Sequence, residues 1–179
     1  MAQKTYIGRK GQDIDVANIS ASGTLTVVGA VTMIGEAVEA AGATLTVTAA
    51  LHAGRVIAFG KTTGTICTLP AATGTGNVYR FVIATTATSN ANIIKVANAT
   101  DVMNGSLNLQ ADDDSDGTLK CWMAEVDDDT MSFAGAATSG GIVGGYIECT
   151  DYAAGFWSCF ARTISAGGSE ATCFTATVS

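Results

Sequence analysis

Val78-Tyr79-Arg80-Phe81-Val82-Ile83 is the stretch of the sequence that decides the fold. Successive side chains of a strand point to opposite faces of its sheet. Tyr79, Phe81 and Ile83 would therefore share one face, which is apolar throughout, while Arg80 would lie on the other. The alternation predicts a strand with its apolar face toward a core.

Strand signals of this kind recur along most of the chain. Clusters of Gly, Asn, Asp and Ser, which are typical of turns, separate them. One short helix is expected, over Glu36 to Ala41. This pattern predicts an all-β fold, a β-sandwich or jelly-roll-like barrel with an extended N-terminal arm. The expected strands are 24–33, 43–50, 55–60, 64–69, 78–86, 92–97, 102–110, 118–126, 130–136, 142–149, 155–164 and 171–178.

The composition argues for a protein that binds copies of itself. Only 14% of the 179 residues are charged, against about 25% in a typical soluble domain. A surface so poor in charge suggests that other subunits cover much of it. The net charge of −7 argues against direct binding of nucleic acid, whose phosphates an acidic domain repels.

The N-terminal segment differs from the rest of the chain. Residues 1–10 contain Lys4, Arg9 and Lys10 and no acidic residue. We expect residues 1–50 to form an arm and a β segment rich in small residues, and residues 51–179 to form the sandwich. Tyr6, Arg9 and Lys10 are the candidate docking residues, because a basic arm can bind an acidic neighbour.

A weak repeat lies in the same segment, where Thr-Leu-Thr-Val occurs at 24–27 and again at 44–47. Such a segment hides its apolar face poorly on its own. It could pack against symmetry mates or a neighbouring protein, or the two copies could be edge strands of one sandwich.

The chain shows no signal-peptide pattern and no run of 18 apolar residues, so we expect synthesis in a cytoplasm and no membrane span. Five cysteines at wide spacings, without a Cys-x-x-Cys pair, predict free thiols rather than a disulfide framework.

The acidic run Asp112-Asp113-Asp114-Ser115-Asp116-Gly117 resembles the opening of a calcium loop. The twelfth position of such a loop needs a glutamate and here is Met123, inside an expected strand. We therefore predict that this run and the second one, Asp127-Asp128-Asp129, are solvated hairpin turns without a tightly bound ion.

No residue pattern indicates catalysis. His52 is the sole histidine, and nothing in the sequence selects one of the five cysteines as its nucleophilic partner. We predict no enzyme activity, no cofactor and no metal site. Four late aromatic residues favour core and interface contacts over a sugar-stacking platform: Tyr152, Phe156, Trp157 and Phe160.

Two stretches carry a resemblance to a known class of protein. The first is Thr68-Leu69-Pro70-Ala71-Ala72-Thr73-Gly74-Thr75-Gly76-Asn77-Val78-Tyr79-Arg80-Phe81, and the second runs from Ile94 to Ser106. Together they resemble a module of small tailed-bacteriophage virion proteins, the capsid decoration, cement or head-fibre proteins. The resemblance covers about residues 60–178.

The resemblance implies a β-rich structural protein on the outer capsid surface, a homo-oligomer with a trimer favoured, whose partner is the major capsid protein. Such proteins have no catalytic residues to carry over. The alternative function is a head-fibre or tail-associated adhesin that binds host surface glycan. That function would place an exposed Tyr or Trp beside Asp or Asn in a concave patch.

Overall fold

The computed structural model describes residues 38–40, 42–111, 119–134, 138–166 and 170–178. These residues belong to one compact unit, Gly35–Ser179. The remainder of the chain, residues 1–34, is a separate unit that lies outside the described residues.

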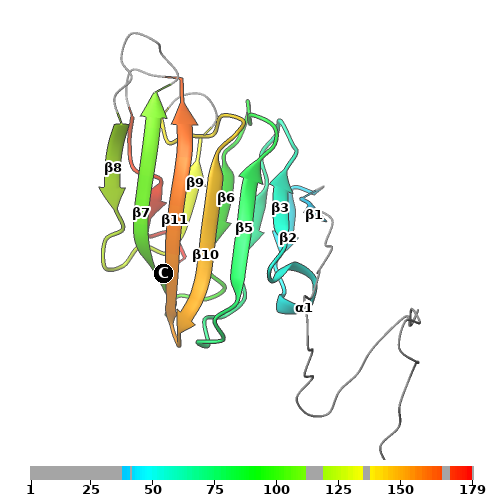
Figure 1. Ribbon diagram of the computed structural model, residues 1–179, viewed down its shortest axis with the longest axis vertical. Coiled ribbons are helices and arrows are strands. Elements are labelled where there is room, and N and C mark those ends of the chain that lie inside the picture. Colours follow the sequence, from blue (N-terminus) through cyan, green and yellow to red (C-terminus); the bar gives the residue numbers. More distant parts are fainter. Residues whose placement is uncertain (1–37, 41, 112–118, 135–137, 167–169, 179) are drawn as a thin grey trace, which may run out of the picture. The chain divides into compact units, whose positions relative to one another are not determined.

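The described residues form a sandwich of two mixed β-sheets, which confirms the all-β prediction (Figure 1). The seven-stranded sheet has the order β1 (Val38–Glu39), β3 (Val56–Phe59), β5 (Val78–Ile83), β10 (Tyr146–Ala153), β11 (Phe156–Ser165), β7 (Val102–Ala111) and β8 (Leu119–Met123). The five-stranded sheet has the order β12 (Phe174–Thr175), β9 (Thr130–Phe133), β6 (Asn92–Lys95), β4 (Ile66–Thr68) and β2 (Thr44–Thr46).

The first six strands wind between the two sheets in three successive coils. β1, β3 and β5 lie parallel to one another in the seven-stranded sheet, and β2, β4 and β6 lie parallel in the other. Each coil therefore stacks on the one before it. The later strands β9, β10 and β12 pair antiparallel to their neighbours. Strands β11, β7 and β8 complete the seven-stranded sheet, with β11 and β7 parallel to one another.

Inward-facing side chains from both sheets form one apolar core. Tyr79, Phe81 and Ile83 of β5 are buried, as the alternation predicted. Trp157 of β11 is fully buried and packs edge-on against Tyr79, with ring centroids 5.7 Å apart. β4, β6 and β9 contribute Cys67, Ile94, Met131 and Phe133 from the opposite sheet. This shared core explains why the sandwich needs both sheets.

Two local predictions near the start of the described residues are wrong. The segment expected to be a helix, Glu36 to Ala41, contains strand β1. The strand expected over 43–50 ends at Thr46, and Ala49–His52 forms the short helix α1. We expected the sandwich to begin near residue 51, whereas β1 and β2 already belong to its sheets.

Buried aspartates fix several of the loops. Asp101 accepts a hydrogen bond from the Ala72 amide at 2.8 Å, which links the two stretches that carry the phage-protein resemblance. In the second acidic run, Asp127 is exposed, but Asp128 and Asp129 are buried. Asp128 accepts the Glu125 amide at 2.7 Å, so the prediction of a fully solvated turn is wrong for this run.

Candidate functional site

The outward-facing side of the seven-stranded sheet, called here the outer face, is the most distinctive surface of the described residues. Along β11 the pattern of exposure alternates, with Phe156 and Phe160 outward and Trp157 inward. Strand pairing places outward residues of β7, β8 and β10 beside them. Among the described residues, eight large apolar side chains are exposed, and five of them lie here: Leu119, Met123, Tyr152, Phe156 and Phe160.

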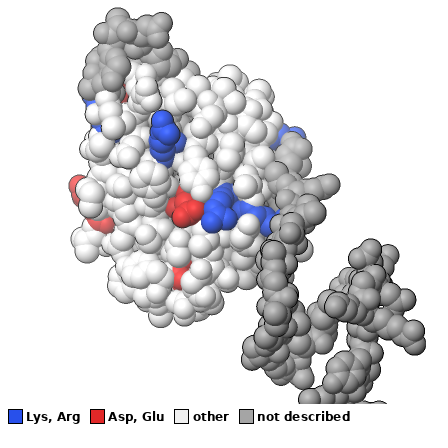
Figure 2. Space-filling model, viewed as in Figure 1, with Lys and Arg blue, Asp and Glu red and all other residues white. Residues whose placement is uncertain are grey.

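Charged side chains are sparse on this face (Figure 2). Arg80 of β5 donates through Nε to Glu148 Oε2 of β10 at 3.0 Å, and the Tyr146 hydroxyl donates to the same oxygen at 2.9 Å. The bond to Glu148 raises the pKa of the Arg80 guanidinium above its usual value. The pair thus neutralises itself on the face and adds no net charge.

A hollow of about 460 Å³ lies where β7, β10 and β11 run side by side on the outer face. Its lining residues are Asn104, Gly105, Thr150, Tyr152 and Ser158. The sheet register explains why they meet, because Thr150 pairs with Ser158, and Ser158 pairs with Asn104 on the next strand. Three strands therefore place an amide and two hydroxyls in one row across the sheet.

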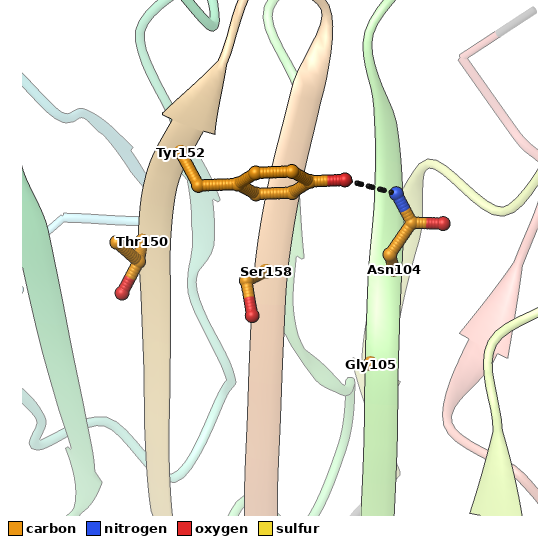
Figure 3. Close-up of a pocket in the computed structure, with 5 residues that line it drawn as sticks. All are labelled: Asn104, Gly105, Thr150, Tyr152 and Ser158. Atoms are coloured by element: carbon orange, nitrogen blue, oxygen red, sulfur yellow. Dashed lines mark hydrogen bonds between the residues drawn. The ribbon is translucent and has the colours of Figure 1, made fainter. Parts of the chain in front are cut away.

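Tyr152 forms one wall of this hollow. Figure 3 shows its side chain reaching from β10 across β11, above Ser158, to Asn104 on β7. The Asn104 side-chain amide donates to the Tyr152 hydroxyl oxygen at 3.0 Å, which fixes the ring in this position. The Phe156 ring lies beside it, tilted by 38° with the centroids 6.2 Å apart.

Gly105 keeps its part of the hollow free of a side chain. A Cβ atom at this position would lie 1.6 Å from the backbone carbonyl oxygen of Cys159, where no substituent fits. The backbones of β7 and β11 approach one another too closely there for any residue other than glycine.

Of the residues considered for catalysis, His52 and four of the cysteines lie apart from the outer face, whereas Cys121 faces outward from β8. His52, on α1, is buried, and its Nδ1 accepts a hydrogen bond from the Thr48 amide at 3.0 Å. The five cysteines are free thiols; Cys121 is exposed, while Cys67, Cys149, Cys159 and Cys173 are buried. Within the described residues, no cluster of three or more His, Cys, Asp or Glu side chains is placed to hold a metal ion.

Several sequence-based candidates lie outside the described residues. These are the docking residues Tyr6, Arg9 and Lys10 and the acidic run 112–117. Helix α1, with four residues, is the longest helix in the part of the chain that the structure describes, and none there is long and apolar enough to cross a membrane.

The four aromatic residues divide between two roles. Trp157 belongs to the core, whereas Tyr152, Phe156 and Phe160 are exposed on the outer face. No sequence motif singled out Asn104, Thr150 or Ser158. The alternation along each strand was the available signal for their outward direction, but only the order of the strands brings them together.

Comparisons with protein-family models, with curated proteins and with solved structures found no match to this chain.

Proposed function

We propose that this chain is a virion structural protein that decorates and stabilises a phage capsid as a homo-oligomer, bound to the outer capsid surface. The sequence resemblance to capsid decoration proteins suggests this role, and an all-β sandwich is compatible with it. Decoration needs two kinds of contact: one between copies of the chain and one to the capsid lattice.

One observation carries the proposal of self-association. β8 is an end strand of the seven-stranded sheet, and Leu119, Cys121 and Met123 all face outward from it. The exposed fractions of Leu119 and Met123 are 58% and 76%. We call these three residues the β8 patch.

Proteins usually protect an end strand with charge or proline, because its unpaired backbone groups can bind another strand. The one charged residue of β8, Lys120, forms an ion pair with Glu170. The β8 patch therefore has no charged side chain, and this favours a second copy of this chain as its binding partner.

Light scattering of the purified full chain tests this contact. We expect a homo-oligomer, with a trimer favoured, and expect Leu119→Lys combined with Met123→Lys to produce monomers. Leu51→Lys is the matched control, because Leu51 is also 60% exposed but lies on α1. A monomeric wild-type chain, or a double variant that stays oligomeric, would contradict the proposal.

Attachment to the capsid is assigned to the N-terminal arm on sequence grounds. Lys4, Arg9 and Lys10 supply positive charge, and apolar residues such as Ile7 and Ile14 supply contact area. Several weak contacts in each oligomer act together on a repeating lattice, which makes decoration stable.

Sedimentation with capsid particles tests this assignment. Deletion of residues 1–20 is expected to leave a folded β-protein that no longer decorates particles. Arg9→Glu with Lys10→Glu is expected to weaken attachment by a smaller amount that depends on salt. If the truncated chain saturates particles with unchanged affinity, the arm is not the attachment site.

A further inference from the structure

The hollow beside Tyr152 has the chemistry of a binding site for a neutral, hydroxyl-rich ligand. None of its lining residues is charged. A charged ligand would lose hydration there without gaining a counter-charge. The nearest outward carboxylate along β10, Glu148, is already bound by Arg80 and Tyr146.

The polar groups of the hollow have unused hydrogen-bonding capacity. The side chains of Thr150 and Ser158 make no hydrogen bond with any described residue, so both hydroxyls are available to a ligand. The Tyr152 hydroxyl accepts from Asn104 and keeps its own proton to donate. The Asn104 amide oxygen is free to accept. The hollow is therefore lined by hydroxyl groups that can both donate and accept, as a ligand with several hydroxyl groups requires.

An aromatic wall adds the second requirement of a sugar site. Tyr152 is 51% exposed as a residue, and Phe156 beside it is 43% exposed. The face of an aromatic ring is electronegative and attracts the C–H groups on one side of a pyranose. The hydrogen bond to Asn104 holds the ring in place, so less side-chain entropy is lost on binding.

A second hollow, on the five-stranded sheet, lacks this combination. It has a volume of about 380 Å³ and is lined by aliphatic, threonine and serine side chains with Lys95, and it contains no aromatic ring. Of these two hollows, the Tyr152 hollow has both an aromatic stacking surface and free hydroxyls.

We propose that the hollow formed by Asn104, Gly105, Thr150, Tyr152 and Ser158 binds a neutral pyranose, as a free glycoside or as the terminal residue of a glycan. Its volume lies within the range of small-ligand sites, about 300–1,000 Å³. For one sugar ring in an open site, the dissociation constant should be on the order of millimolar. This inference is independent of attachment to a capsid.

The test is an NMR titration of the full chain with methyl glycosides of glucose, galactose, mannose and N-acetylglucosamine. At least one glycoside should saturate, and Tyr152→Ala should weaken its binding by about tenfold or more. Asn104→Ala should weaken it by about fivefold, because one acceptor and the support of the ring are lost. Tyr152→Phe keeps the ring and should have a smaller effect than Tyr152→Ala.

Phe160→Ala is the matched control, since Phe160 is an exposed aromatic residue of β11 that does not line the hollow. It should leave glycoside binding unchanged. The amide spectrum of each variant shows whether the sandwich is intact. A printed array of oligosaccharides then separates the two sources of the sugar: tighter binding of chains that end in the preferred sugar indicates a glycan, and equal affinity indicates a free glycoside.

Three outcomes would overturn the proposal. The first is the absence of saturable binding by any neutral glycoside up to about 100 mM, far above the expected dissociation constant. The second is binding that a folded Tyr152→Ala variant retains in full. The third is binding of uronic acids or sugar phosphates alone, because the ligand would then be anionic.

Discussion

Asp151 at the end of β10 should be one of the residues on which stability depends most. Its side chain is 3% exposed and accepts four short hydrogen bonds from the loop that follows β4. The donors are the amides of Thr73 at 3.0 Å, Gly74 at 2.6 Å and Thr75 at 3.1 Å, with the Thr75 hydroxyl at 2.7 Å. One carboxylate thereby ties this loop to the centre of the seven-stranded sheet.

The substitution Asp151→Asn replaces one carboxylate oxygen by an NH2 group. Each oxygen accepts two of the four short bonds. If the NH2 group replaces Oδ1, it faces the Thr73 and Gly74 amides, which can only donate. If it replaces Oδ2, it faces the Thr75 amide, while the Thr75 hydroxyl can rotate to accept from it. Hydrogen bonds to charged groups contribute about 1.5–3 kcal/mol each. Thr73, Gly74 and Thr75 are themselves exposed, and water can replace part of the lost bonding. We therefore expect the free energy of unfolding to fall by about 2–4 kcal/mol.

The same hydrogen bonds determine how the contribution of Asp151 to the free energy of unfolding depends on pH. Burial alone raises the pKa of Asp151, but the bonds from Thr75, Gly74 and Thr73 outweigh it and hold the pKa below its usual value. A carboxyl whose pKa is lower in the folded state stabilises the fold above its unfolded pKa of about 3.9. That stabilisation is lost as the pH falls through the folded pKa. The difference between wild type and Asp151→Asn should therefore shrink in acid.

Urea unfolding at fixed protein concentration measures both effects, with the fluorescence of Trp122 and of the buried Trp157 as the reporter. Asp127→Asn is the control, because it makes the same chemical change at an exposed carboxylate. The reasoning is refuted if Asp151→Asn lies within about 0.5 kcal/mol of wild type at pH 7, the spread of ordinary surface substitutions. The reasoning is also refuted if the difference in unfolding free energy between wild type and Asp151→Asn is as large in acid as at pH 7.

Two further predictions concern the sheets. In the native protein a thiol reagent should label Cys121 quickly and the other four cysteines slowly. Burial raises the pKa of Cys67 to about 12, and the other three slow cysteines are also buried. All five thiols should react after unfolding, and fast labelling of two or more thiols in the native protein would contradict this prediction. Gly105→Ala should lower the free energy of unfolding by more than about 3 kcal/mol, because the new Cβ would collide with the Cys159 carbonyl. Unfolding experiments would contradict this steric argument if the variant were as stable as Ser106→Ala, a truncation at the next position.

Alternation predicted the longer strands well because it reports burial directly. β5, β7 and β11 match the expected segments closely, and each has one buried face. The failure at β1 has a different origin. This two-residue strand exists through its parallel pairing with β3, a non-local contact that outweighs the weak helical preference of Glu36 to Ala41.

The error at 43–50 could have been avoided. The alternation of Thr44-Leu45-Thr46-Val47 stops before Ala49, and Ala49-Ala50-Leu51-His52 consists mainly of good helix formers. The sequence therefore contained a signal for α1, although a continuous strand was predicted over 43–50.

The candidate sugar site could not be predicted, because it depends on strand order. Tyr152 and Asn104 lie 48 residues apart in the chain. They meet because β11 pairs on one side with β10 and on the other, in parallel, with β7. No local pattern specifies that a strand at 102–111 becomes the parallel neighbour of one at 156–165.

The Thr-Leu-Thr-Val repeat acquires a structural meaning from the coils. Its second copy contains β2, the end strand of the five-stranded sheet, where Leu45 stacks beside Cys67 of β4. The 22 residues from Leu45 to Cys67 are close to the 20 that separate the two copies. Parallel strands of neighbouring coils must be separated by about one coil of sequence, because each coil has to return to the same sheet in register. Of the two interpretations of the repeat, the edge strand of the same sandwich therefore holds for the second copy, while the first copy, 24–27, lies outside the described residues.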